Sequence, residues 1–226
     1  MRKRLFSLFG IALIGAAVFT QTAYAQEQAG GHGKASRVTA GLGLALSSAE
    51  DIKLKNGGLF DAKFDVGGGF GFNVFVDYLL PVGVPVSLGA EFGVHGASFE
   101  TKGTTLEDTI TAIPLLLRAA YHFAPAPKVD LYIVGKLGYV FAAWKGDARD
   151  MMEDDFEAKV DDVGGVGFGF DLGAVYSFNE RFGLFAELGF DRYALETKIK
   201  NSDYDISMTL EAPFTRFLIF GVNAKF

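Results

Sequence analysis

Apolar side chains alternate with small or polar side chains along most of this sequence. In GFGFDLGAVYSF (167–178) the apolar positions include Phe168 and Phe170. The positions between them include Gly169 and Asp171. Successive side chains of a β-strand point to opposite faces, so this segment has one apolar face and one small or polar face. The pattern predicts a strand that separates two different environments.

The same alternation recurs along the chain, which predicts eight strands separated by polar or Gly- and Pro-containing connections. The predicted strands cover 38–46, 69–78, 86–97, 113–123, 131–141, 167–178, 182–193 and 215–226.

The connections alternate in length. Short connections follow the second, fourth and sixth strands, at 79–85, 124–128 and 179–180. The other connections are long and polar, as at 47–65 and 145–162. A meander with short turns at one end and four long loops at the other is typical of a transmembrane β-barrel.

A soluble eight-stranded barrel has the same alternation with its apolar face inward. Its interior has room only for inward side chains and one small ligand, whereas roughly forty apolar side chains share the apolar face here. That face is therefore predicted to contact lipid. Closure follows, because unpaired backbone groups in hydrocarbon cost several kcal/mol each. The predicted fold class is all-β, an eight-stranded antiparallel up-and-down transmembrane β-barrel.

The N-terminus has the features of an export signal. Basic residues precede an apolar run over 5–19, and an A-x-A pattern ends at Ala25. The run is shorter than a membrane-spanning helix, which favours a cleaved signal peptide over an anchor. We expect a signal peptide over 1–25, a flexible periplasmic lead-in over 26–36, and the barrel over 37–226.

Charge and composition exclude several functions. Without the basic residues Arg2, Lys3 and Arg4 of the signal, 18 Lys and Arg face 27 Asp and Glu, which argues against a nucleic-acid partner. The chain has no cysteine, so it offers no disulfide, thiolate nucleophile or Cys-based metal site. Loop 145–162 is acidic but lacks the spacing of a calcium loop, so an exposed loop is favoured over a metal site. We expect no cofactor.

Charged residues on the polar face are expected to meet inside the barrel. Counted from the short-turn end of each strand, they lie about five to seven residues in, near the membrane midplane at ~3.3 Å per residue. Unpaired charges there are costly, so the layer should be hydrogen-bonded and paired. It would act as a structural plug or, alternatively, as a gate. The predicted layer contains Asn73, Glu91, Arg118, Lys136, Asp171 and Glu187.

Two arginines lie an even number of residues from predicted lipid-facing residues of the same strand, so the alternation places them on the lipid-facing side; we call this having the same parity. Arg192 has the parity of Leu188, and Arg216 has the parity of Phe220. Each lies about ten residues from the short-turn end, where a long cationic side chain reaches the headgroup region. We expect this pair to bind a lipopolysaccharide phosphate through charged hydrogen bonds, or a bulge to turn one of them away.

The signal peptide, the eight-strand meander and the C-terminal GVNAKF (221–226) resemble small bacterial outer-membrane barrels of the OmpA, OmpX and OmpW type. The segment AIPLLLRAAYHF (112–123) is also similar to a central strand of these proteins. The resemblance implies an outer-membrane location, contact with outer-membrane lipids, and an insertion signal at Gly221 and Phe226 for the barrel-insertion machinery. It covers 37–226 and does not determine a function.

Three functions remain open. The first is a structural or surface-interaction barrel with a plugged polar lumen and a possible external ligand at its loops. The second is an OmpW-like conduit for small apolar solutes. The third, a lipid-modifying enzyme, has little support: His95 and His122 lie on the polar face at different heights, and no G-x-S-x-G motif occurs. We expect no catalytic residue. The loop residues that would line a conduit entrance are Phe60, Phe64, Phe99, Met151, Met152 and Phe156.

Overall fold

The computed structural model describes most of the chain beyond residue 36. The described residues are 37–49, 52–56, 60–81, 83–100, 107–126, 128–154, 157, 159–161, 163–201 and 206–226. The predicted signal peptide and lead-in lie outside them. No helix among these residues has the length and apolar character needed to cross a membrane.

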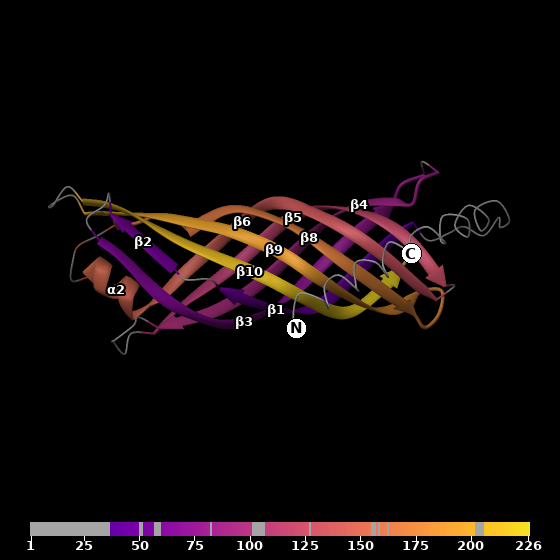
Figure 1. Cartoon of the computed structure of the whole chain (residues 1–226), viewed down its shortest axis with the longest axis horizontal. Coiled ribbons are helices and arrows are strands. Elements are labelled where there is room, and N and C mark those ends of the chain that lie inside the picture. The colour runs from indigo at the N-terminus through magenta and orange to yellow at the C-terminus, as the bar shows by residue number, and fades with distance from the viewer. Residues whose placement is uncertain are drawn as a thin grey trace, which may run out of the picture.

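Nearly all of the described chain forms long, tilted β-strands (Figure 1). The alternating segments of the sequence account for most of their length, since side chains with a period of two point to opposite faces of a strand. The elements are β1 (Val38–Ala49), β2 (Ile52–Asn56), β3 (Phe60–Leu79), β4 (Val86–Glu100), β5 (Glu107–Ala126), β6 (Val129–Gly146), α2 (Asp147–Asp154), β7 (Lys159–Val160), β8 (Val163–Ser177), β9 (Phe182–Asn201) and β10 (Ile206–Lys225).

The strands form a closed antiparallel meander. Each long strand pairs with its neighbour in sequence, and β1 pairs with both β3 and β10, which closes the sheet. Strand β2 continues β1 along the same neighbours, β3 and β10. The two-residue β7 adds only to the end of β9. The described chain therefore forms an eight-stranded barrel whose first strand is interrupted, and the predicted fold class is confirmed.

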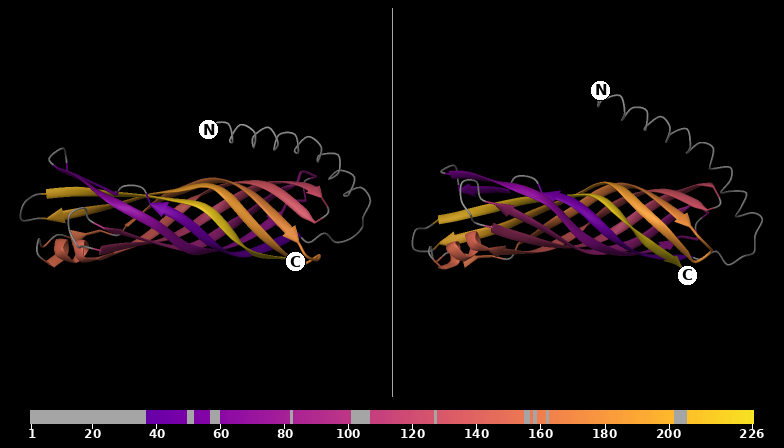
Figure 2. Two further views of the ribbon diagram at one scale, coloured as in Figure 1. Left: turned by 60° about the horizontal axis from the view of Figure 1, so that its bottom comes forward. Right: turned by 90° about the horizontal axis from the view of Figure 1, so that it is seen from below.

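The two ends of the barrel differ (Figures 1 and 2). We call the end that carries α2 and the β2–β3 hairpin the loop end. The C-terminus and the connections between β3 and β4, β5 and β6, and β8 and β9 lie at the opposite end, here called the turn end. The predicted bounds of two long loops were wrong in part, because the flanking strands extend further than the sequence pattern indicated. Most of 47–65 belongs to β1, β2 and β3, and 145–162 contains the end of β6, helix α2 and β7.

The large apolar side chains cover the outside of the barrel. Phe70, Leu117 and Leu188 are 79, 72 and 60% exposed, although they lie in the middle of regular strands. The opposite faces of the same strands are buried in the lumen, where Asn73, Arg118 and Glu187 are at most 2% exposed. An apolar exterior around a polar interior is the pattern of a barrel in lipid.

Strand β9 shows where this pattern ends. Its outward apolar residues from Phe182 to Phe190 span about 20 Å along the axis, close to the usual apolar band of about 25 Å. Beyond Arg192 the outward residues include the exposed Lys198 and Lys200, while the inward residues include the apolar Leu195 and Ile199. The last ten residues of β9 extend about 25 Å further at the same rise and tilt. The barrel thus projects beyond the apolar band at its loop end, with a polar surface and an interior that includes the apolar Leu195 and Ile199 as well as the polar Asp108 and Thr197.

Two lumen glycines make room for aromatic rings. A Cβ on Gly173 would overlap the ring of Tyr132, and one on Gly41 would overlap the ring of Phe75. Both rings are buried inside the barrel. The glycines of the polar face therefore accommodate bulky neighbours across a narrow lumen rather than leaving it open.

Candidate functional site: the charged cluster of the lumen

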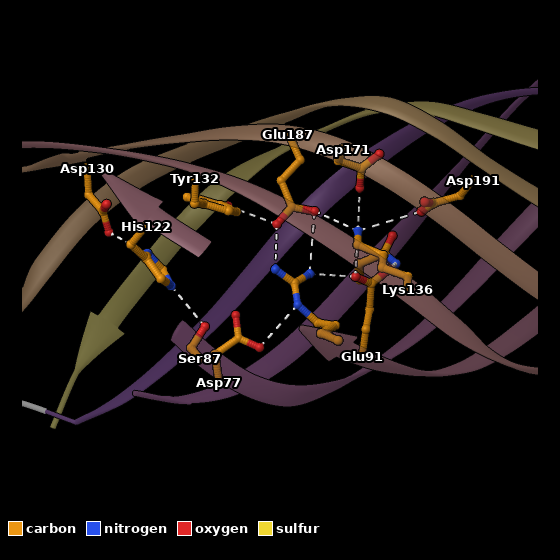
Figure 3. Close-up of polar contacts among 12 residues, drawn as sticks. Asp77, Ser87, Glu91, His122, Asp130, Tyr132, Lys136, Asp171, Glu187 and Asp191 are labelled. Carbon is orange, nitrogen blue, oxygen red and sulfur yellow. Dashed lines mark hydrogen bonds and ion pairs between the residues drawn. The ribbon is translucent and has the colours of Figure 1, made fainter. Parts of the chain in front are cut away.

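Three basic and five acidic side chains meet in the middle of the lumen (Figure 3). We call them the lumen cluster. Seven of the eight barrel strands contribute, all except the first. The members are Asp77 of β3, Glu91 of β4, Arg118 of β5, Lys136 of β6, Asp171 of β8, Glu187 and Asp191 of β9, and Arg216 of β10.

Arg118 uses all three guanidinium nitrogens. Its Nη1 donates to Glu91 Oε2 at 2.6 Å, and its Nη2 donates to Glu187 Oε1 at 2.6 Å. Its Nε donates to Asp77 Oδ1 at 3.1 Å. The guanidinium also lies over the ring of Phe75, 4.2 Å from the centroid. This residue therefore links β5 to β3, β4 and β9 through charge-assisted hydrogen bonds, which are stronger than neutral ones.

Lys136 lies directly opposite Arg118 in the β5–β6 register. Two like charges in such a pair repel each other. The lysine Nζ lies 2.9 Å from Glu91 Oε2, 2.7 Å from Glu187 Oε2 and 2.5 Å from Asp171 Oδ2. Glu91 and Glu187 thus each contact both cations and compensate the repulsion between them.

Arg216 completes the cluster from β10. Its Nη2 donates to Asp171 Oδ2 at 2.9 Å, and the guanidinium also contacts Glu91 and Asp191. The side chain is only 1% exposed. The prediction that Arg216 faces lipid headgroups was therefore wrong.

A β-bulge explains the error. The β1–β10 and β9–β10 registers both shift at Phe217. Arg216 and Leu218 pair with the adjacent Ser47 and Leu46 of β1, so β10 has one extra residue relative to β1. Phe217 itself is 41% exposed. An extra residue reverses the alternation of every side chain beyond it. Parity counted from the C-terminus therefore assigns Arg216 to the wrong face.

The structure brings the six residues of the predicted charge layer together. Asn73 Nδ2 donates to Glu91 Oε1 at 2.6 Å, which joins it to the charged members. Sequence counting missed Asp77, Asp191 and Arg216. The alternation in the sequence already placed Asp77 and Asp191 on the inward face. Their distances in residues from the turn end differ from those of the predicted layer, but strand tilt and stagger bring them to the same position along the barrel axis.

Apolar side chains fill the lumen on both sides of the cluster. Towards the turn end lie Phe75 and Phe185, whose rings meet edge to face at 5.1 Å between centroids. Towards the loop end, Leu195 and Ile199 are 1% exposed, and Trp144 Nε1 donates to Asp108 Oδ1 at 3.0 Å. Apart from Asp77, which lies closer to the turn end of β3 than Phe75, the charged cluster is thus enclosed between two buried layers. Of the six predicted entrance residues, only the Met151 side chain is among those described, and it is half-buried.

The remaining predicted site residues lie elsewhere. Arg192 keeps its outward parity and is half-buried, at the level where the apolar band of β9 ends. Gly221 lies opposite Gly43 and Phe185 in the β-sheet. Phe226 is 73% exposed at the turn end, and its backbone N–H donates to the carbonyl of Val38 at 2.8 Å. The Arg192–Arg216 pair is therefore not formed.

Comparison with known proteins gives the same architecture. The family model described as outer membrane protein beta-barrel domain matches residues 11–211. The chain belongs to this outer membrane β-barrel family. As a member, it is a protein of the bacterial outer membrane. No curated protein matches this outer membrane barrel significantly.

Solved outer membrane proteins share its fold. The crystal structure of OprG from Pseudomonas aeruginosa is 16% identical and matches with a TM-score of 0.61, over 85% of this chain and 97% of OprG. The solid-state NMR structure of AlkL in DMPC bilayers is 15% identical and matches with a TM-score of 0.52, over 84% of this chain and 90% of AlkL. At these identities the similarity concerns the fold.

Proposed function

We propose that this outer membrane barrel is a non-conducting surface protein. Its lumen is closed by the lumen cluster and the two apolar layers, and its loop end presents an interaction surface outside the cell. The contact of Glu91 with Arg118, Lys136 and Arg216 is the observation that carries the proposal. One carboxylate contacts three cations from three strands in the middle of the lumen, and a paired layer of this kind would obstruct the passage of water and ions.

The length of the barrel supports the surface role. In bacterial barrels short turns face the periplasm and longer loops face the exterior. The loop end then extends about 25 Å beyond the apolar band. It carries α2, whose Asp147, Asp150 and Glu153 are exposed. A polar extension of this kind is suited to contacts with macromolecules outside the cell.

Single-channel recording in planar bilayers tests the closed lumen. The purified protein is expected to give no steady conductance beyond rare small openings. Glu91→Ala removes the shared acceptor of the three cations, so it should increase the frequency of openings. A stable, large conductance of the pure wild-type protein would show that the lumen is open.

Attachment of cells tests the surface role. Cells that produce the full chain are compared with cells whose α2 residues 147–154 are replaced by a Gly-Ser segment, on protein-coated and uncoated surfaces. We expect weaker attachment when α2 is replaced. Equal attachment of the two kinds of cells, at equal amounts of folded barrel, would show that α2 does not take part in the interaction.

A conduit for small apolar solutes is the second candidate. The apolar side chains at the loop end of the lumen, among them Ile110, Leu195 and Ile199, favour it. An apolar solute could contact these groups before it reaches the lumen cluster. Faster uptake of the apolar dye N-phenylnaphthylamine by producing cells, lost on Leu195→Asp, would support the conduit over the closed barrel.

A further inference from the structure

A serine, a histidine and an aspartate form a hydrogen-bonded chain at the turn end of the lumen. Ser87 near the start of β4, His122 near the end of β5 and Asp130 near the start of β6 come from three neighbouring strands. Ser87 Oγ lies 2.8 Å from His122 Nε2, and His122 Nδ1 lies 2.9 Å from Asp130 Oδ2. Figure 3 shows the three side chains in line, beside the lumen cluster, and Asp77 is the cluster member drawn nearest to Ser87.

The chemistry of the three groups determines the direction of these hydrogen bonds. An ionised carboxylate only accepts, so His122 Nδ1 carries the proton and donates to Asp130. In the neutral ring Nε2 is then the acceptor, and the Ser87 hydroxyl donates to it. This is the arrangement in which a histidine can remove the proton of a serine hydroxyl and make the oxygen a nucleophile.

The surrounding structure holds His122 in this orientation. Its ring packs against the ring of Tyr132, with 5.4 Å between centroids. The Tyr132 hydroxyl donates to Glu187 Oε1 at 2.8 Å, which fixes the tyrosine to the lumen cluster. The backbone N–H of His122 donates to the carbonyl of Pro85 at 2.8 Å, in the turn before β4. The imidazole is therefore positioned from three sides.

The site lies at the mouth of the lumen. The His122 and Asp130 side chains are 16 and 22% exposed, while Ser87 is 3% exposed beside them. On the inner side, Phe75 and Phe185 close the lumen. A reactant would therefore approach from the periplasm and would have to be small. The acidic excess of the lumen cluster disfavours anions, so an uncharged reactant fits best.

We propose that Ser87 is the nucleophile of an esterase site for small, uncharged carboxylic esters, with His122 as general base and Asp130 as a positioning residue. Ser87 Oγ bonds to the ester carbonyl carbon while its proton moves to His122 Nε2. The proton then passes to the leaving alkoxide as the ester C–O bond breaks, which releases an alcohol. Water attacks the acyl-serine and gives its proton to His122. The bond between the acyl carbon and Ser87 Oγ then breaks, His122 returns the proton to Oγ, and the carboxylic acid leaves. This activity would exist beside the closed lumen and does not depend on it.

Labelling with a fluorophosphonate tests the nucleophile directly. Ser87 Oγ bonds to phosphorus, the P–F bond breaks, and fluoride leaves while His122 takes the hydroxyl proton. The full-length folded protein in detergent should be labelled at Ser87, as located by mass spectrometry, and Ser87→Ala should abolish the label. Ser177→Ala is the matched control: Ser177 lies at the same end and accepts a hydrogen bond from Lys225 Nζ at 3.2 Å.

The roles of the other two residues are tested by rates. His122→Gln should slow labelling by about 100-fold or more, the usual range for loss of a general base. In hydrolysis of p-nitrophenyl acetate, Asp130→Asn should lower kcat with little change in KM, and Asp130→Glu should restore part of kcat. The heat-dependent gel shift of the folded barrel verifies that each variant is folded.

Three outcomes would overturn the proposal. These are a folded wild-type protein that takes no label, a label that persists in Ser87→Ala, and a folded His122→Gln variant that is labelled as fast as the wild type.

Discussion

The guanidinium of Arg216 lies 2.9 Å from the carboxylate of Asp171, across the lumen from β10 to β8. The contact exists because the bulge at Phe217 turns Arg216 inward. Without the bulge, the lumen cluster would have two cations for five carboxylates, and an arginine would face lipid. The bulge therefore improves the charge balance of the interior and removes a charge from the apolar surface.

Arg216→Met is expected to destabilise the folded barrel by about 3–5 kcal/mol, the usual cost of removing one partner from a buried ion pair. Methionine keeps most of the length of the side chain but removes one of the three cations of the lumen cluster, so that Asp171 and Asp191 keep only Lys136, at 2.5 and 3.6 Å. The midpoint of urea unfolding in detergent measures the change. The matched control Arg192→Met lies near the interface and should cost about 1 kcal/mol or less. Equal losses in both variants would contradict a special role for the buried arginine.

Gly173→Val should destabilise the barrel by about 1–3 kcal/mol, the usual cost of overpacking. Its new side chain would overlap the buried ring of Tyr132. In Gly135→Val, by contrast, the added Cβ has no neighbour within 4 Å. Thermal gel-shift midpoints compare the two variants. A tolerated Gly173→Val would mean that the ring can move aside.

Cysteine labelling determines the orientation in the membrane. The chain has no native cysteine, so a single introduced thiol has no background. Asp150→Cys on α2 should react with an impermeant maleimide on whole cells, whereas Lys128→Cys at the turn end should react only after the outer membrane is opened. Both native side chains are exposed. The reverse pattern would invert the topology.

Arg192→Gln should reduce the amount of lipopolysaccharide that co-purifies with the barrel. A cation near an anionic membrane surface contributes about 1 kcal/mol, which corresponds to roughly a fivefold change in binding. Arg181→Gln, exposed at the turn end, is the control and should retain the wild-type amount. If lipid retention is unchanged by Arg192→Gln, this arginine does not bind the headgroup phosphates.

The sequence alone determined the architecture and the contents of most of the lumen. A period of two reports which residues share a face, whatever their partners, so Asn73, Glu91, Lys136 and Asp171 were assigned to the interior without any contact being known. Volume then decided which face meets lipid, because the apolar side chains are too many for a narrow lumen. The lengths of the strands at the loop end were underestimated, since polar outward and apolar inward positions there reverse the pattern used to recognise them.

Only the tertiary structure determined the position of the bulge and which side chains of different strands meet. The bulge at Phe217 depends on pairing with β1 and β9 together, and nothing in TRFLIF (215–220) marks it. The joining of Ser87, His122 and Asp130 depends on the stagger of three strands, which sets the height at which side chains from different strands meet. The alternation of side chains can be recognised in the sequence of a single strand. Register and stagger depend on how the strands pair, so they are determined only when the sheet closes into a barrel.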